Sequence, residues 1–157
     1  MASRRLLILN KTQIQQKIDR MAYQILEDNL EETDLVMAGI IDRGYTLAKR
    51  LKKVVEKISG IKVKLMKIDL DTESIHVQYN SDTPVSEASD KVIILVTDVL
   101  NSGRAMAYGL NVFLDIPLKK IRTVVLIDRS HRVFPVSADF TGLELATVLK
   151  EHVEVVL

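Results

Sequence analysis

The chain has 157 residues, of which 47% are hydrophobic and 27% charged, and its formal net charge at pH 7 is +1. This composition is typical of one globular domain with a buried core, and the net charge gives no general argument for binding nucleic acid or membrane. The absence of cysteine excludes disulfides and thiolate metal sites. No apolar run approaches the roughly 20 residues of a membrane span, and the run at 6–9 is too short for a signal peptide. We therefore expect one cytoplasmic domain over residues 1–157, with no membrane association.

The first part of the chain, up to residue 70, alternates between helix and strand patterns. Thr12 with Gln15 forms a capping-box pattern, and apolar residues from Ile14 to Ile25 follow one helical face. Gly60 is a stop signal for a second helix. The predicted elements are a short strand at 6–9, a helix through 14–25, a strand at 35–41, a helix at 47–58 and a strand at 63–70.

The second part of the chain continues the alternation around one strongly apolar strand. Residues 92–96 form a continuous apolar run of β-branched character, as expected for a strand covered on both faces. Asn101, Ser102 and Gly103 interrupt the run before helical spacing resumes. The predicted elements are strands near 75–79 and at 92–96, a helix at 106–114, a strand at 121–127, and short pieces around Pro135 and Gly142 that we do not order. This alternation predicts an α/β fold: one mostly parallel twisted sheet with helices on both faces.

Polar segments follow three of the predicted strands, at 42–44, 97–98 and 128–129. Ligands of such sheets bind beyond the carboxyl ends of the strands. After Asn101 the backbone amides lie at a predicted helix start, which favours an anion such as phosphate, and Gly103 permits close approach. The Ser102 hydroxyl can donate to that anion, and the carboxylate of Asp98 can accept from ribose hydroxyls. The alternative is that these are ordinary turn and cap residues.

Three segments together resemble the type I phosphoribosyltransferases. VIILVTDVLNSGRA, at 92–105, resembles the family's phosphoribosyl diphosphate signature of an apolar strand, two acids, a short loop and Thr-Gly-x-Thr. AGIIDRGYTLAKRL, at 38–51, resembles the diphosphate-binding loop, and VVLIDRSHRVFPVSADFTG, at 124–142, the late segment near the base pocket. Within the family the chain is most similar to the PyrR-type pyrimidine-operon regulators that are also uracil phosphoribosyltransferases, in register from residue 6 to about residue 145.

The resemblance implies transfer of the 5-phosphoribosyl group from phosphoribosyl diphosphate to a nucleobase, with uracil the first choice. It also implies a small hood at about 68–90, a homodimer or larger homo-oligomer, and Mg²⁺ bound through the substrate, where Asp98 is the one side chain that could contact the ion. Asp98 and Arg43 are the catalytic candidates. The ribose and 5-phosphate would contact Thr97, Asp98, Val99, Leu100, Asn101, Ser102, Gly103, Arg104 and Ala105. The diphosphate would contact Ile41, Asp42, Arg43 and Gly44, and the base would contact Arg129 and Phe140.

Two of these candidates have plainer alternatives, and several positions depart from the family pattern. Arg43 can instead pair with a nearby carboxylate, and Phe140 can instead be a core residue. Thr97 stands where the family has its first acid, Asn101 where many relatives have an acid and the PyrR type a tyrosine, and Ala105 where the motif ends in threonine. There is no Lys or Arg between Lys67 and Lys91, in the hood region.

These departures leave open a second hypothesis, a catalytically weak, nucleotide-sensing regulator that could act through RNA. A concentration of basic residues could contact phosphates: Lys49, Arg50, Lys52, Lys53, Lys57, Lys62, Lys64 and Lys67. The simpler interpretation is that most of them form the solvent face of a helix and the strand after it. The predicted first helix mixes both signs of charge, so we favour the enzyme and do not favour RNA as a partner.

Overall fold

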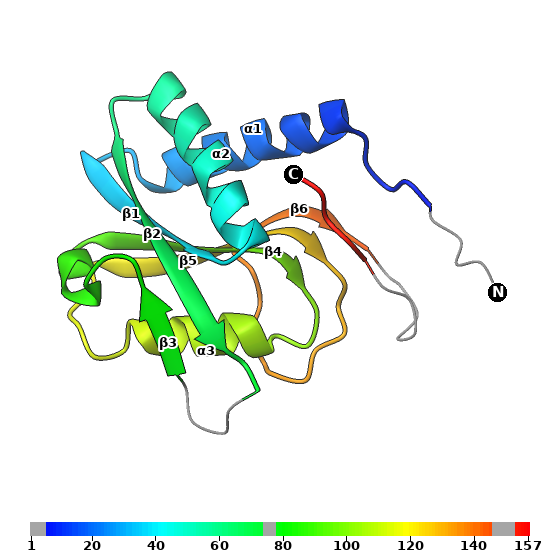
Figure 1. Cartoon of the computed structure of the whole chain (residues 1–157). Coiled ribbons are helices and arrows are strands. Elements are labelled where there is room, and N and C mark those ends of the chain that lie inside the picture. The colour runs from blue at the N-terminus through cyan, green and yellow to red at the C-terminus, as the bar shows by residue number, and fades with distance from the viewer. Residues whose placement is uncertain (1–5, 74–77, 146–152) are drawn as a thin grey trace.

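The protein is a single α/β sheet structure, seen in a computed structural model that describes residues 6–73, 78–145 and 153–157. Six strands lie in the order β3-β2-β1-β4-β5-β6 (Figure 1). Every neighbouring pair is parallel except β2 with β3, which is antiparallel. In chain order the elements are α1 (Lys11–Asp28), β1 (Asp34–Ile40), α2 (Arg43–Ile58), β2 (Lys62–Asp71), β3 (Gln78–Ser81), a 3₁₀ helix η1 (Val85–Ala88), β4 (Val92–Leu100), α3 (Arg104–Val112), β5 (Lys120–Asp128) and β6 (Phe140–Glu144).

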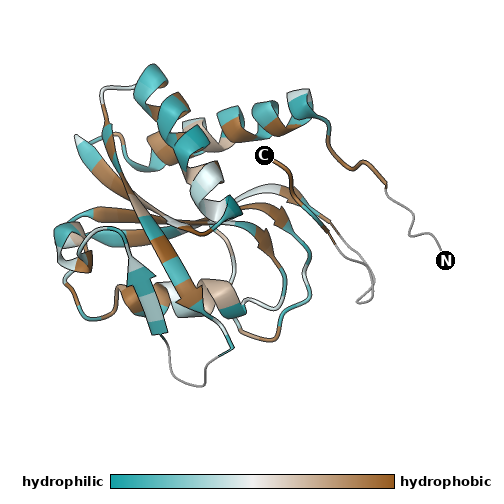
Figure 2. Ribbon diagram, in the orientation of Figure 1, coloured by the Kyte–Doolittle hydropathy of each residue, from teal (hydrophilic) through white to brown (hydrophobic). Residues whose placement is uncertain are grey.

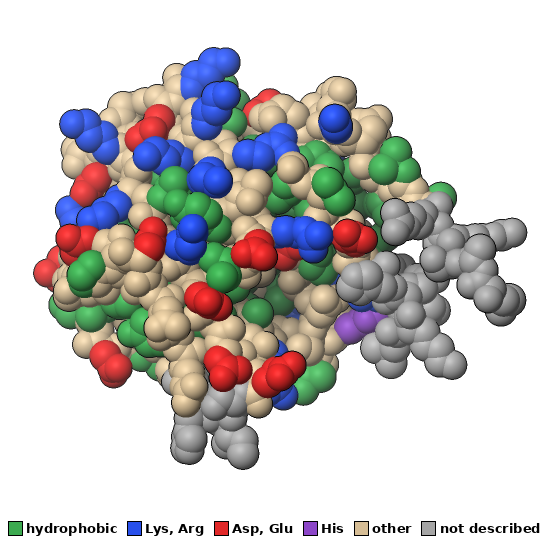
Figure 3. All heavy atoms as spheres, in the orientation of Figure 1, with side chains coloured by type: hydrophobic (Ala, Val, Ile, Leu, Met, Phe, Trp, Pro, Cys, Tyr) green, Lys and Arg blue, Asp and Glu red, His purple; other side chains and the backbone are tan. Residues whose placement is uncertain are grey.

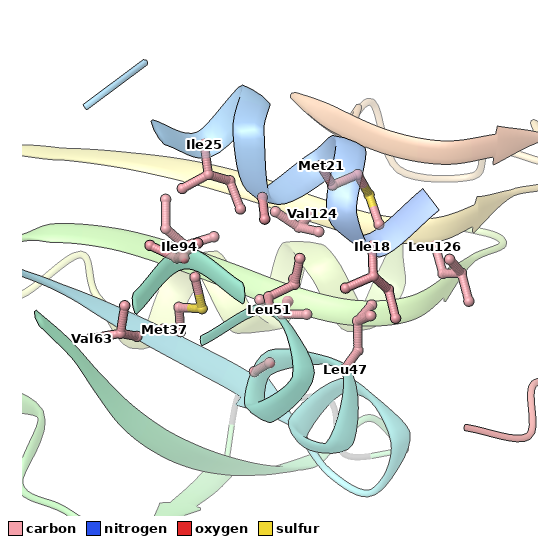
Figure 4. Close-up of a cluster of buried hydrophobic side chains, with 14 of the residues drawn as sticks. Ile18, Met21, Ile25, Met37, Leu47, Leu51, Val63, Ile94, Val124 and Leu126 are labelled. Atoms are coloured by element: carbon pink, nitrogen blue, oxygen red, sulfur yellow. The ribbon is translucent and has the colours of Figure 1, made fainter. Parts of the chain in front are cut away.

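Helices cover both faces of the sheet, which confirms the predicted fold class. In Figure 1 the helices α1 and α2 lie on one face and α3 lies on the other. Figure 4 shows the core under α1 and α2, where Ile18 and Met21 of α1 meet Leu51 of α2 and Met37 and Ile94 of the sheet. A second apolar cluster packs on the α3 face. Because both faces are covered, brown apolar stretches run through the central strands in Figure 2.

The start of α1 differs from the predicted capping box. The N-cap is Asn10, whose side chain accepts from the amide of Gln13 at 2.8 Å while the Gln13 side chain accepts from the Asn10 amide at 2.9 Å. Thr12 therefore lies inside the helix, and its pairing with Gln15 was the wrong register of the same motif. Asparagine caps a helix at least as well as threonine, so the earlier residue begins the helix.

Other boundaries also differ from the prediction. Residues 6–9 do not form a strand; Leu6 and Leu7 are 82% and 77% exposed. The strand predicted near 75–79 is observed as β3 at Gln78–Ser81, and positions 74–77 lie outside the described residues. α3 ends at Val112, so Leu114, 72% exposed, is not part of its buried face. Among the described residues, no helix is both long and apolar enough to cross a membrane.

Candidate functional site

The three predicted polar segments meet at one edge of the sheet. In β1, Gly39 lies opposite Val96 of β4 and Lys67 of β2, and Leu100 of β4 lies opposite Asp128 of β5. The loops that leave β1, β4 and β5 therefore leave the sheet on the same side, as parallel strands require. β4 is longer than predicted, because its ladder to β5 continues through Leu100. Thr97 and Asp98 therefore lie three and two residues before Leu100, the last residue of β4.

The loop from β4 to α3 forms a pocket of about 240 Å³. Gly103 is the N-cap of α3 with φ +88°, a left-handed conformation that L side chains rarely adopt, and it has no side chain with which to cap the helix. The Ser102 hydroxyl oxygen accepts from the Arg104 amide, the first of the helix, at 3.3 Å. The partial positive charge of the helix start therefore faces this loop. The pocket is lined by Thr72, Thr97, Val99, Leu100, Asn101, Ser102, Gly103, Arg104, Ala105 and Met106. This set contains every residue predicted for the ribose and 5-phosphate except Asp98, which is half-buried next to Thr97 along β4.

The start of α2 lies directly against β4, next to the backbone of Thr97, which lines the pocket. A Cβ on Gly44 would lie 2.6 Å from the carbonyl oxygen of Val96 and 3.0 Å from Cα of Thr97. Gly39 similarly admits the backbone of Tyr45. No side chain caps the first turn of α2, although Asp42 occupies the N-cap position. A second helix start therefore faces this edge of the sheet.

Within this loop the candidate residues are not equivalent. The amide of Ile41 donates to the carbonyl of Ile68 at 2.9 Å, so it extends the sheet and is already engaged. The peptide bond between Ile41 and Asp42 is cis. The Arg43 guanidinium lies 3.4 Å from a carboxylate oxygen of Glu154, and both side chains are about half exposed. Arg43 therefore does pair with a carboxylate, but with one from the C-terminal segment and not with Asp42.

Residues 128 and 129 end β5 beside the pocket. Arg129 is only 6% exposed, and its guanidinium donates to the amide oxygen of Asn101 at 3.1 Å, while its backbone amide donates to Leu100. Asp128 is 7% exposed and accepts two parallel hydrogen bonds from Arg132, at 2.8 and 2.7 Å. This bidentate bond from Arg132 holds the pKa of the Asp128 carboxyl below its usual range, and Asp128 in turn raises the pKa of Arg132.

Phe140 is not brought to the pocket. It begins β6 opposite Val124, four positions before Asp128, and is partly buried against the apolar cluster under α1 and α2. A spacing of about 3.3 Å per strand residue places it roughly 13 Å from the carboxyl edge. The sequence missed Thr72, whose carbonyl accepts from the Arg104 guanidinium at 3.3 Å, because no local pattern links the end of β2 to α3.

The side chains near the pocket limit how a metal ion could be bound. No group of three or more Asp, Glu, His or Cys side chains that could hold a metal occurs in the described ranges. The side-chain oxygens that line the pocket belong to Thr72, Thr97, Asn101 and Ser102, and the Asp98 carboxylate follows Thr97 along β4 without lining it. Hard oxygen donors in this small number fit a Mg²⁺ ion that takes most of its ligands from water and substrate phosphates.

Comparison with known proteins identifies a family. The family model described as "Phosphoribosyl transferase domain" matches residues 7–155. The "Bifunctional protein PyrR" of Macrococcus caseolyticus is 36% identical over 96% of this chain and 91% of that protein. The protein of the same name from Caldicellulosiruptor bescii is 35% identical over 96% of this chain and 87% of its own length.

Solved structures show the same fold. The hypoxanthine phosphoribosyltransferase from Staphylococcus aureus superposes with a TM-score of 0.79 and 18% identity, over 90% of this chain and 78% of that one. The hypoxanthine phosphoribosyltransferase of Trypanosoma cruzi gives a TM-score of 0.78 and 19% identity, over 90% and 82% of the two chains. With the family match spanning nearly the whole sequence and PyrR proteins at about the same length, the chain belongs to the phosphoribosyltransferase family.

Proposed function

We propose that this protein transfers the 5-phosphoribosyl group from phosphoribosyl diphosphate to uracil and releases diphosphate. The observation that carries the proposal is the pocket lined by Thr72, Thr97 and residues 99–106 at the start of α3, with the start of α2, which lacks a side-chain cap, beside it. Two helix starts at one sheet edge suit a substrate that carries a phosphate at each end of a ribose. The similarity to PyrR proteins is what favours uracil over other bases.

In this proposal the 5-phosphate binds the loop from Asn101 to Ala105. The amides at the start of α3 and the Ser102 hydroxyl would donate to its oxygens, and Gly103 keeps the backbone free of a Cβ at that point. The carboxylate of Asp98 would accept from the ribose hydroxyls. Leaving-group charge would be stabilised by Arg43 and the amides of 42–44, which requires Arg43 to exchange Glu154 for diphosphate.

Magnesium would bind through the diphosphate and ribose oxygens with Asp98 nearby, and when bound it neutralises charge that develops on the departing diphosphate. Arg129 is the proposed contact for the base or for diphosphate, because it ends β5 beside Asn101. Phe140 would reach the base only by a rearrangement of β6. A homodimer or larger assembly is part of the proposal on family grounds.

The second candidate is a catalytically weak regulator that senses nucleotides and binds RNA. It is favoured by exposed basic side chains on α2 and β2, and blue side chains gather over the α2 region in Figure 3. Part of this charge is already engaged: Lys64 lies 2.6 Å from Glu87, and Lys49 and Lys67 lie over the Tyr45 ring at 5.2 and 4.8 Å. Acidic side chains are mixed with the basic ones on the same face, which disfavours a uniform RNA platform.

The test combines turnover with binding. Purified protein is incubated with phosphoribosyl diphosphate, Mg²⁺ and uracil, cytosine, hypoxanthine or guanine, and nucleotide formation is followed by chromatography. The proposal expects uridine monophosphate as the main product. Calorimetric titration should show that Arg43→Met weakens phosphoribosyl diphosphate about tenfold and leaves ribose 5-phosphate unchanged, because only the former carries the diphosphate.

Lys57→Met is the matched control, since Lys57 lies in the last turn of α2, at the opposite end from Arg43. It should bind both compounds as the wild type does. No nucleotide formation with any base, combined with nanomolar and sequence-selective binding of a pyrimidine-gene leader RNA over a scrambled control, would make the regulator the better assignment.

A further inference from the structure

The loop between β5 and β6, residues 129–139, packs directly on the proposed phosphate loop. The carbonyl oxygen of Ser102 accepts hydrogen bonds from the amides of both Val133 and Phe134, each at 2.8 Å. A Cβ built on Gly103 would lie 2.6 Å from Cγ2 of Val136 and 3.2 Å from the carbonyl oxygen of Phe134. The position of the phosphate loop is therefore fixed in part by residues 133–136.

A third contact comes from the first residue of α3. The Arg104 guanidinium lies 5.3 Å from the centre of the Phe134 ring. Ser102, Gly103 and Arg104, three consecutive residues of the phosphate loop and helix start, thus all touch the same short segment. Displacement of that segment would move the amides at the start of α3.

One ion pair holds this segment in place. Arg132 donates through both terminal nitrogens to Asp128, at 2.8 and 2.7 Å, and through Nε to the carbonyl of Val136 at 2.7 Å. Asp128 also accepts from the amide of Ser130 at 2.9 Å. Because Asp128 is the last residue of β5 and is paired with Leu100 in β4, the guanidinium ties the far end of the loop back to the sheet.

The geometry of the Asp128–Arg132 pair fixes how the two side chains are oriented. Planar guanidinium and carboxylate groups that form two parallel bonds fix each other's orientation as well as their distance. The Asp128 side chain is 10% exposed and that of Arg132 is 26%, so water screens the pair less than the exposed pairs elsewhere on the surface. A lysine at position 132 would keep the positive charge but could not form the two parallel hydrogen bonds to Asp128.

We propose that Asp128 and Arg132 are positioning residues for the 5-phosphate site: their ion pair holds residues 133–136 against Ser102 and Gly103 and so sets the direction of the amides at the start of α3. The inference rests on the proposed function, because it assumes that this loop binds the phosphate. Amide donors must be held within about 0.5 Å of their productive positions for a ligand to gain the full interaction. Neither Asp128 nor Arg132 needs to touch the ligand.

The experiment compares ligands with and without the 5-phosphate. Ribose 5-phosphate and uridine monophosphate are titrated by calorimetry into wild-type protein, Arg132→Met and Asp128→Asn, with uridine as the ligand that lacks phosphate. The two variants should bind the phosphorylated compounds at least about tenfold more weakly, and uridine within about twofold of wild type. In turnover, the KM for phosphoribosyl diphosphate should rise more than kcat falls.

Arg122→Met is the matched control. Arg122 lies near the amino end of the same strand, where its Nε bonds a carboxylate oxygen of Asp28 at 3.1 Å. The control also loses a partly buried arginine pair, but it should bind ribose 5-phosphate as the wild type does. A purely structural role for Arg132 would lower the melting temperature of both arginine variants and change the affinity of neither.

Folding of each variant is checked by far-ultraviolet circular dichroism, and Arg132→Lys carries the test if Arg132→Met does not fold. Wild-type binding of ribose 5-phosphate with unchanged affinity in folded variants overturns the inference and leaves the proposed function standing. No binding by the wild type at millimolar ribose 5-phosphate overturns the proposed function, and this inference with it.

Discussion

Replacing Gly103 by alanine should both destabilise the protein and weaken phosphate binding. At φ +88° an L side chain costs about 1 to 2 kcal/mol, and the new Cβ would lie 2.6 Å from Cγ2 of Val136, so a neighbour must move. Overpacking of this kind costs roughly 1 to 3 kcal/mol, and the lost flexibility of the unfolded chain returns about 0.4 to 1 kcal/mol. We expect the free energy of unfolding to fall by about 2 kcal/mol in urea titrations at neutral pH.

Two further variants separate the terms of this prediction. Gly60→Ala is the control, because nothing lies within 4 Å of its Cβ position and its φ is not positive; it should change the free energy by less than about 0.5 kcal/mol. Adding Val136→Ala to Gly103→Ala removes the nearest clashing atom. The double variant should recover the free energy of unfolding that was lost to overpacking, but not the part lost to the left-handed φ. If Gly103→Ala and Gly60→Ala unfold at the same urea concentration, the conformational reasoning about this loop is refuted. The affinity for ribose 5-phosphate should fall at least about tenfold in Gly103→Val, which adds bulk at the same point.

Three other changes test the electrostatics of the site. The folded-state pKa of Asp128 lies below its unfolded value of about 3.9, so the stabilisation from Arg132 is complete above that pH and is lost as the pH falls through the folded value. The wild type should therefore be more stable than Asp128→Asn at pH 6, and urea titrations down to pH 3 should show the difference shrinking. Glu154→Gln frees Arg43 from an exposed pair and should strengthen phosphoribosyl diphosphate binding about twofold by calorimetry; weaker binding would mean that Glu154 orients Arg43 productively. Thr97→Asp should raise Mg²⁺-dependent turnover with uracil by adding a carboxylate, and a folded variant with unchanged low turnover would shift the proposed cause to the segment at about 68–90, where the family resemblance predicts a hood.

The fold class could be predicted from the sequence, and so could the meeting of the three polar segments at one edge of the sheet. Both follow from local patterns: a covered strand reads as a continuous apolar run, and parallel strands must end on the same side. The prediction that Gly103 lets the backbone approach a phosphate came from the strand, turn and helix pattern alone and stays a prediction. The structure adds a different reason for glycine there: its φ is left-handed and a Cβ would meet Val136 and Phe134. Periodicity placed α2 and β5 within a few residues of their observed bounds.

The contacts that the sequence did not reveal join segments far apart in the chain. The hydrogen bonds from Val133 and Phe134 to Ser102 link two loops about 30 residues apart, and backbone donors carry no residue signature. The pairing of Arg43 with Glu154 depends on where the C-terminal segment lies. That position is set by packing, because Val155 belongs to the same apolar cluster as the buried side of α2. Local patterns also fail where two registers are equally good, as at the start of α1.

The two helix starts at the site are positioned by backbone contact, and this separates binding from turnover. α2 approaches β4 because Gly44 has no Cβ, and α3 approaches residues 134–136 because Gly103 has none. The anion binding that we propose at these points would depend on backbone amides and on helix direction, and the side chains of Thr97 and Ala105 change neither. Those substitutions remove a carboxylate and a hydroxyl, groups that act on the metal, the ribose or the phosphate oxygens. The physical expectation is therefore a protein whose affinity for phosphoribosyl diphosphate is closer to that of its relatives than its kcat is, and measurement of both quantities decides between an enzyme and a sensor.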